Sequence, residues 1–157
     1  MSNLDAFLAT IRHSEGTDKA PDPYAVTFGY HFTITDFRDH PAVLGTWHGE
    51  PLDFLGPAYV GKVSTAAGAY QIIRPTWVGL KSQLKLPDFR PPSQDEAATL
   101  LITQAGALHL IETGQIAAAI DRCHEIWASL PGSTSGQPQA SMAALMQAYT
   151  DSGGAFA

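Results

Sequence analysis

Apolar residues recur at helical spacing in the first segment of the chain. The stripe consists of Leu4, Phe7, Leu8 and Ile11. Positions three and four residues apart lie on one face of a helix, so this spacing predicts an amphipathic helix. Ser2 or Asn3 can cap its start, and Gly16 can end it.

Between residues 24 and 35 the period changes to two. Apolar side chains occupy the even positions, namely Tyr24, Val26, Phe28, Tyr30, Phe32 and Ile34. This alternation predicts strands with one buried face, and Gly29 is expected at a bend or bulge. Residues 41–61 are rich in glycine, proline and aromatic residues without a clear period, and we expect a long loop with short pieces of structure there.

Helical spacing returns in the rest of the chain. The segments are 75–84, 93–114, 116–127 and 142–149. Ser93 and Glu96 fit a capping box, in which each side chain bonds the backbone N–H of the other residue. Gly106 predicts a kink or a division into two helices. The order of helix, strand-rich insert and further helices indicates one α+β domain, dominated by helices, over residues 1–157.

The charge balance excludes one class of function. The chain has nine basic and fifteen acidic residues, a net charge of −6 and a pI near 5.3. A nucleic-acid binder needs an excess of basic residues to displace counterions, so we expect no nucleic-acid partner. The charge is uneven, because residues 62–90 carry five basic residues and one acidic residue, a net +4.

Cysteine and histidine usage argues against cofactors. The chain has one cysteine, Cys123, which excludes an internal disulfide and lies on an apolar stripe, as expected of an inert buried thiol. His31, His40 and His48 do not have the spacing of known metal ligands. We expect no metal and no cofactor. The first residues lack a signal-peptide pattern and no apolar run is long enough to span a membrane, so we expect cytoplasmic synthesis.

Glu15 is the most informative acidic residue. It continues the stripe of Leu8 and Ile11. If the helix runs on as far as residue 15, the carboxyl group would be partly desolvated, which raises its pKa. Glycoside cleavage needs such an acid, protonated near neutral pH, to donate its proton to the leaving oxygen. The alternative is a carboxyl group at a helix end that points to solvent.

A cluster of small and polar residues covers positions 64–71. Small residues such as Ser64 and Gly68 let a backbone approach a ligand, while Tyr70 and Gln71 could stack on a sugar and hydrogen-bond to it. The cluster fits equally well a loop that enters a helix. Asp36 and Asp39 are candidates for a second catalytic carboxylate, but acidic residues in turns more often cap backbone amides.

Several segments together resemble the lambdoid phage endolysins. They are Ser14-Glu15-Gly16-Thr17-Asp18, Asp39-His40-Pro41, Ser64-Thr65, Gly68, Tyr70-Gln71, Asp88-Phe89, residues 92–95, 106–108, 119–123 and 126–132. The resemblance runs through nearly the whole chain in one order. It implies a lysozyme-like fold, in which a mainly helical lobe and a small β lobe enclose a saccharide groove.

The resemblance also implies an activity. Family members are lytic transglycosylases that cut the β-1,4 bond between N-acetylmuramic acid and N-acetylglucosamine in peptidoglycan. The muramyl C6 hydroxyl attacks its own anomeric carbon, which gives a 1,6-anhydro product and causes lysis of the bacterium. Glu15 matches the catalytic acid, and Ser64, Gly68, Tyr70 and Gln71 would bind the substrate. We further expect a monomer that reaches the periplasmic wall after a holin permeabilises the membrane.

Two alternatives stay open from the sequence. The first is a hydrolytic muramidase, in which Asp36 or Asp39 would orient a water molecule beside Glu15. The second is a lysozyme-shaped module that binds glycan without cutting it.

Overall fold

The computed structural model describes residues 1–157, and the chain divides into two compact units. The first unit contains Met1–Lys19 and Ala98–Ala157, and the second contains Ala20–Ala97. The helices are α1 (Asn3–Glu15), α2 (Pro41–Leu44), α3 (Arg74–Leu84), α4 (Pro91–Gln104), α5 (Leu108–Glu112), α6 (Ile116–Cys123) and α7 (Met142–Asp151). The strands are β1 (Glu50–Pro51) and β2 (Val63–Ser64). None of these helices has both the length and the hydropathy of a membrane-spanning segment.

Helix α1 forms as the sequence predicts. The Ser2 hydroxyl accepts a hydrogen bond from the Asp5 backbone N–H, and the Asp5 carboxylate accepts one from the Ser2 backbone, which completes a capping box. At the other end Gly16 adopts φ 77°, a left-handed conformation that suits glycine, and its N–H bonds to the carbonyl groups of Arg12 and His13. The helix therefore ends immediately after Glu15.

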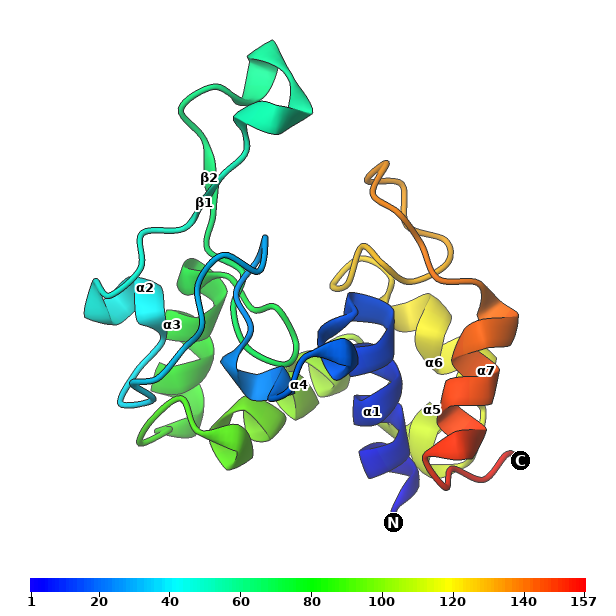
Figure 1. Cartoon of the computed structure of the whole chain (residues 1–157). Helices are drawn as coiled ribbons and strands as arrows, with labels where there is room; N and C mark the ends of the chain where they lie inside the picture. The colour runs from blue at the N-terminus through cyan, green and yellow to red at the C-terminus, as the bar shows by residue number, and fades with distance from the viewer. The chain divides into compact units, whose positions relative to one another are not determined.

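The first unit is a cluster of helices around α1. In Figure 1, α1 (dark blue) lies beside α5 and α7, and α6 packs against α5 and α7. The buried face of α1 includes Phe7 and Ile11, and α6 contributes Ile116 and Ile120. The long helical pattern before residue 114 is divided into α4 and α5, with Gly106 at φ 75° between them, which confirms the predicted division. Helix α6 ends at Cys123, earlier than its apolar stripe suggested.

The prediction of strands over residues 24–35 is wrong. The segment contains a single 3-10 turn (Pro23–Ala25) and isolated bridges, among them Val26 with Thr33. Gly29 and Tyr30 have φ values of 84° and 61°, and the Tyr30 N–H bonds to the Thr27 carbonyl group at 3.0 Å. Two successive left-handed residues reverse the chain and cannot belong to an extended strand. A tight turn therefore interrupts the alternating segment.

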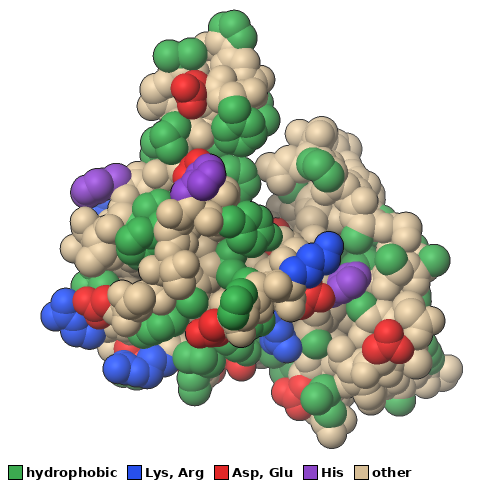
Figure 2. All heavy atoms as spheres, viewed as in Figure 1, with side chains coloured by type: hydrophobic (Ala, Val, Ile, Leu, Met, Phe, Trp, Pro, Cys, Tyr) green, Lys and Arg blue, Asp and Glu red, His purple; other side chains and the backbone are tan.

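An arm projects from the second unit between residues 50 and 64. Strands β1 and β2 pair antiparallel, Glu50 with Ser64, and two 3-10 turns, Asp53–Leu55 and Pro57–Tyr59, connect them (Figure 1). Short pieces of structure within a long loop were expected here, and this expectation is confirmed. Figure 2 shows apolar side chains over the arm. Its exposed apolar residues are Phe54, Leu55, Tyr59, Val60 and Val63.

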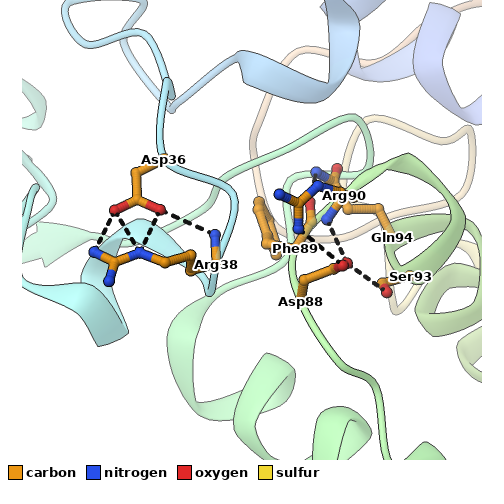
Figure 3. Close-up of polar contacts among 7 residues, drawn as sticks. All are labelled: Asp36, Arg38, Asp88, Phe89, Arg90, Ser93 and Gln94. Atoms are coloured by element: carbon orange, nitrogen blue, oxygen red, sulfur yellow. Dashed lines mark hydrogen bonds and ion pairs between the residues drawn. The ribbon is translucent and has the colours of Figure 1, made fainter.

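Helix α4 begins two residues before the predicted position. Pro91 and Pro92 occupy its first turn, where a missing N–H costs no hydrogen bond. Ser93 is therefore inside the helix, and the predicted capping box with Glu96 does not form. The Ser93 hydroxyl instead donates to the Asp88 carboxylate at 2.9 Å (Figure 3).

Candidate functional site

Glu15 lies at the last residue of α1 and is half-buried in the first unit. Burial raises the pKa of its carboxyl group from 4.5 to about 7, and a hydrogen bond from Ser129 acts in the opposite direction. The carboxyl group is therefore poised to exist in both protonation states near neutral pH. This is the property required of a group that first donates a proton and then accepts one.

Ser129 connects two neighbouring residues of α1. Its hydroxyl bonds the Glu15 carboxyl group, and its oxygen lies 2.5 Å from the Ser14 hydroxyl oxygen. The segment that carries Ser129 follows α6, 115 residues from Ser14 in the sequence. No spacing rule predicts such a contact. The available signal was the resemblance, since both serines lie in the matching segments 14–18 and 126–132.

The predicted sugar-binding residues all lie in the second unit, whereas Glu15 lies in the first. Tyr70 is only 1% exposed, its ring packs edge-on against Tyr24, and its hydroxyl donates to Asp95 at 2.5 Å. This position does not fit the expected stacking of Tyr70 on a sugar, because the ring has no accessible face. Tyr70 anchors the loop instead.

Gly68 and Gln71 shape the same loop. Gly68 is buried at φ 80°, and a Cβ atom there would lie 2.9 Å from the Phe89 ring and closer still to the Gln94 amide. Gln71 has φ 50°, and its side-chain amide donates to the Gly68 carbonyl group at 3.0 Å. Ser64 accepts a hydrogen bond from the Ala66 N–H. Ser64 and Gln71 are half-buried, so each still presents part of its surface.

Gln94 holds this loop in place and was not predicted from the sequence. Its side chain is 1% exposed. The amide oxygen accepts from the Ala69 N–H at 2.9 Å, and the amide nitrogen donates to the carbonyl groups of Tyr24 and Phe89. Three backbone segments thus provide hydrogen-bond partners for both the oxygen and the nitrogen of this buried amide.

Asp36 and Asp39 have structural partners. The Asp36 carboxylate accepts hydrogen bonds from the Arg38 backbone and guanidinium, which lower its pKa to about 2 (Figure 3). Asp39 accepts from the Trp77 indole at 2.8 Å and from the Lys81 ammonium at 2.5 Å. Despite the opposing effect of burial, these donors hold the pKa of Asp39 below its ordinary value. Both carboxylates therefore stay ionised and are bonded to nearby donors, as expected for acidic residues in turns.

The cysteine and histidines do not form a metal centre. No group of three or more histidine, cysteine or acidic residues is arranged to hold an ion. Cys123 is fully buried, and burial raises the pKa of its thiol to about 12, which confirms the expected inert thiol. His40 is buried as well, with its ring nitrogens bonded to the Ile72 carbonyl group and the Ala42 N–H. Burial lowers the pKa of His40, so the ring is neutral.

Known proteins match almost the whole chain. The endolysin of Escherichia phage P2 is 40% identical over 156 residues, covering 97% of this chain and 93% of the P2 protein. The endolysin of Escherichia phage lambda is 40% identical over 154 residues, covering 95% and 90%.

Solved structures agree with this similarity. Bacteriophage lambda lysozyme complexed with a chitohexasaccharide has a TM-score of 0.84 and 37% identity, covering 100% of this chain and 98% of that chain. A second structure of lysozyme from bacteriophage lambda has a TM-score of 0.82 and 35% identity over the same shares. The fold is therefore α+β and lysozyme-like, as expected. A sequence model of the family described as endolysin matches residues 5–156, and the chain belongs to the endolysin family.

Proposed function

We propose that this protein is a lytic transglycosylase that cleaves the glycan strands of peptidoglycan, with Glu15 as its catalytic acid and base. The observation that carries the proposal is the half-buried carboxyl group of Glu15, whose pKa burial raises to about 7. Its similarity to the phage endolysins, and to a lysozyme structure that contains a chitohexasaccharide, supports a saccharide substrate. The family match spans both units, which supports a single catalytic domain over residues 1–157.

In the proposed reaction Glu15 acts twice. The protonated carboxyl group donates its proton to the glycosidic oxygen as the bond to the muramyl anomeric carbon breaks. The muramyl C6 hydroxyl then attacks that carbon, and the Glu15 carboxylate accepts the hydroxyl proton. Glu15 returns to its protonated form and the product is a 1,6-anhydro sugar, so no water molecule is consumed. Of the loop residues, we propose that the half-buried Ser64 and Gln71 contact the substrate.

The contacts of Asp36 and Asp39 favour transglycosylation over hydrolysis. An inverting hydrolase needs a second carboxylate that activates water. Arg38 holds Asp36, while Trp77 and Lys81 hold Asp39. The reaction proposed above has no role for a second carboxylate, which agrees with these arrangements.

Replacement of Glu15 tests the catalytic role. Glu15→Gln keeps the size of the side chain but removes its titratable proton, so we expect digestion of purified sacculi to fall at least about 100-fold, in the range of a general acid's contribution. Glu112→Gln is the matched control, because Glu112 also ends a helix of the first unit but is exposed. Digestion by Glu15→Gln at the parent rate would show that Glu15 is not the catalytic acid.

Mass spectrometry of the products separates the reaction types. The parent protein is expected to release muropeptides with 1,6-anhydro ends, each lighter by one water than the corresponding reducing sugar. Reducing ends would identify a muramidase. Binding of chitooligosaccharide without any product after long incubation would instead identify a non-catalytic binding module.

A further inference from the structure

A chain of two serine hydroxyls leads to the Glu15 carboxyl group. Ser14 lies 2.5 Å from Ser129, oxygen to oxygen, and Ser129 bonds Glu15. All three side chains are half-buried, so water competes weakly for their hydrogen bonds. Glu15 is the only catalytic group in the reaction proposed above, and neither Ser14 nor Ser129 has a role in it.

The chemistry of the groups fixes the direction of the chain. An ionised carboxylate can only accept hydrogen bonds, so Ser129 must donate its hydrogen to Glu15 in that state. A hydroxyl has one hydrogen, and Ser129 then has none left for Ser14. Ser14 must therefore donate to Ser129, and the order is Ser14 to Ser129 to Glu15.

The backbone holds both serines rigidly. The Ser129 carbonyl group accepts from the Ala140 N–H at 2.9 Å. Ser129 also lies between two core side chains of the same segment, Trp127 at 3% and Leu130 at 0% exposure. Ser14 belongs to the last turn of α1, which the cap at Gly16 ends. The position of the Ser129 hydroxyl, which donates to Glu15, is thus fixed by two anchored segments.

We propose that Ser129 is a positioning residue for Glu15, and that Ser14 directs the Ser129 hydroxyl toward the carboxyl group. This inference rests on the proposed function of Glu15. By binding one carboxyl oxygen, the hydroxyl fixes the orientation of the group and leaves its proton to be carried by the other oxygen. The hydroxyl also stabilises the carboxylate that remains after proton donation, the state that must accept the C6 hydroxyl proton.

The test compares Ser129→Ala, Ser14→Ala and the double variant by two measurements. The first is the Glu15 pKa in the free protein, followed by ¹³C NMR of the side-chain carboxyl carbon. The second is the dependence of kcat and KM on pH with solubilised peptidoglycan. Ser133→Ala is the matched control, because Ser133 belongs to the same segment and loses a hydroxyl bond to Ser135 at 3.1 Å, away from Glu15.

We expect Ser129→Ala to raise the Glu15 pKa by about one pH unit, because a charge-assisted hydrogen bond to the carboxylate is lost. The alkaline limb of the pH profile of kcat should move to higher pH by the same amount. The value of kcat at its pH optimum should fall, and KM should change little. Ser14→Ala should shift both in the same direction but by less. The double variant should match Ser129→Ala, since Ser14 acts through Ser129. Ser129→Thr, which restores a hydroxyl, should return the pKa toward the parent value.

The two measurements test the positioning role of Ser129 separately from the catalytic role of Glu15. An unchanged Glu15 pKa and an unchanged alkaline limb in Ser129→Ala would overturn the positioning role, even if the variant were less stable. A shifted pKa by NMR with retained activity in Glu15→Gln would instead show that the hydroxyl chain is real and the proposed catalytic role is wrong. Additive shifts in the double variant would refute the order of the chain.

Discussion

Glu15 occupies a position that disfavours its own charge. It is the last residue of α1, where the unpaired carbonyl groups give the helix end a partial negative charge, and it is also half-buried. Burial is the larger cause of the raised pKa, and Ser129 opposes it. A carboxyl group in this environment lowers the stability of the protein when it ionises, which is characteristic of functional rather than structural acids.

The stability of the protein should reflect this ionisation. Because the pKa of Glu15 is about 7 in the folded state and near 4.5 ordinarily, its favourable contribution is complete below about pH 4.5 and is lost as the pH rises through about 7. Glu15→Gln cannot ionise. The free energy of unfolding of the parent should fall between about pH 5 and about pH 8. In Glu15→Gln this fall should be smaller, by on the order of 2–3 kcal/mol.

Urea denaturation at the two pH values measures this difference. Glu112→Gln, which removes an exposed carboxyl group, should behave as the parent does. The same pH dependence in Glu15→Gln and in the parent would mean that Glu15 is ionised at little cost in the folded protein.

Single residues were predictable where one helix carried the information. The partial burial of Glu15 was suggested by the stripe of Leu8 and Ile11 on its own helix, and the resemblance selected it over a solvent-facing carboxyl group. Ser129 does not, because its contact depends on a segment far away in the sequence. Tyr70 looked available for a sugar because tyrosine has both a ring and a hydroxyl, yet Tyr24 and Asp95 use these two parts inside the core.

At the level of elements, the loop around Gly68 depends on close backbone packing. Gly68→Ala would combine a strained left-handed backbone with a Cβ atom 2.9 Å from Phe89, so we expect a loss of about 2–4 kcal/mol in the free energy of unfolding. Gly61→Ala is the control, because Gly61 has nearly the same φ, 79°, with no atom within 4 Å of its Cβ position.

Thermal or urea unfolding of both variants separates the two causes. Gly61→Ala should show only the cost of backbone strain, about 1–2 kcal/mol, and Gly68→Ala clearly more. Equal losses in the two variants would mean that Phe89 and Gln94 move aside without cost.

Helices were more predictable than extended segments. A stripe with its caps is a local property, and Ser2 and Gly16 act as the sequence suggests. Alternation is also local, but it does not exclude a turn, and the segment 24–35 reverses at Gly29 and Tyr30, with Thr27 buried and Tyr30 exposed. Proline at the first turn outweighed the Ser93 capping signal in α4.

For the whole molecule, the uneven charge of the sequence is partly cancelled by folding. Of the five basic residues between 62 and 90, Lys81 pairs with Asp39, which lies outside this range, whereas the pair of Arg90 with Asp88 is already included in the net +4. The local positive charge is thus weaker than the sequence count suggested. An acidic protein without a strong basic patch gains little from long-range attraction to an anionic wall.

Binding to the wall should therefore depend weakly on salt. With Glu15→Gln to prevent turnover, we expect the affinity for sacculi to change less than roughly threefold between low and physiological ionic strength. Co-sedimentation at the two salt concentrations measures it. A steep loss of binding at physiological salt would reveal an electrostatic contact surface that the pairing of charges does not suggest.

The fold class was predictable, but the position at which the chain divides was not. The order of elements predicted an α+β fold and the resemblance implied a lysozyme-like one, and the structural similarity confirms both. The resemblance implied two lobes, but the boundary between the two compact units, at residues 97 and 98, could not be foreseen because it lies inside the continuous helix α4. The helical spacing of apolar residues does not show at which residue a helix stops packing in one unit and begins to pack in the other.

The burial of Cys123 makes the folded protein behave toward thiol reagents as if it had no cysteine. Its sulfur is inaccessible, and a thiol with a pKa of about 12 contributes almost no thiolate at neutral pH. A cysteine introduced on the exposed arm, at Ala58 for example, would then be the single site that a maleimide dye or spin label modifies. The native sequence is therefore already suited to following the arm spectroscopically during attack on the wall.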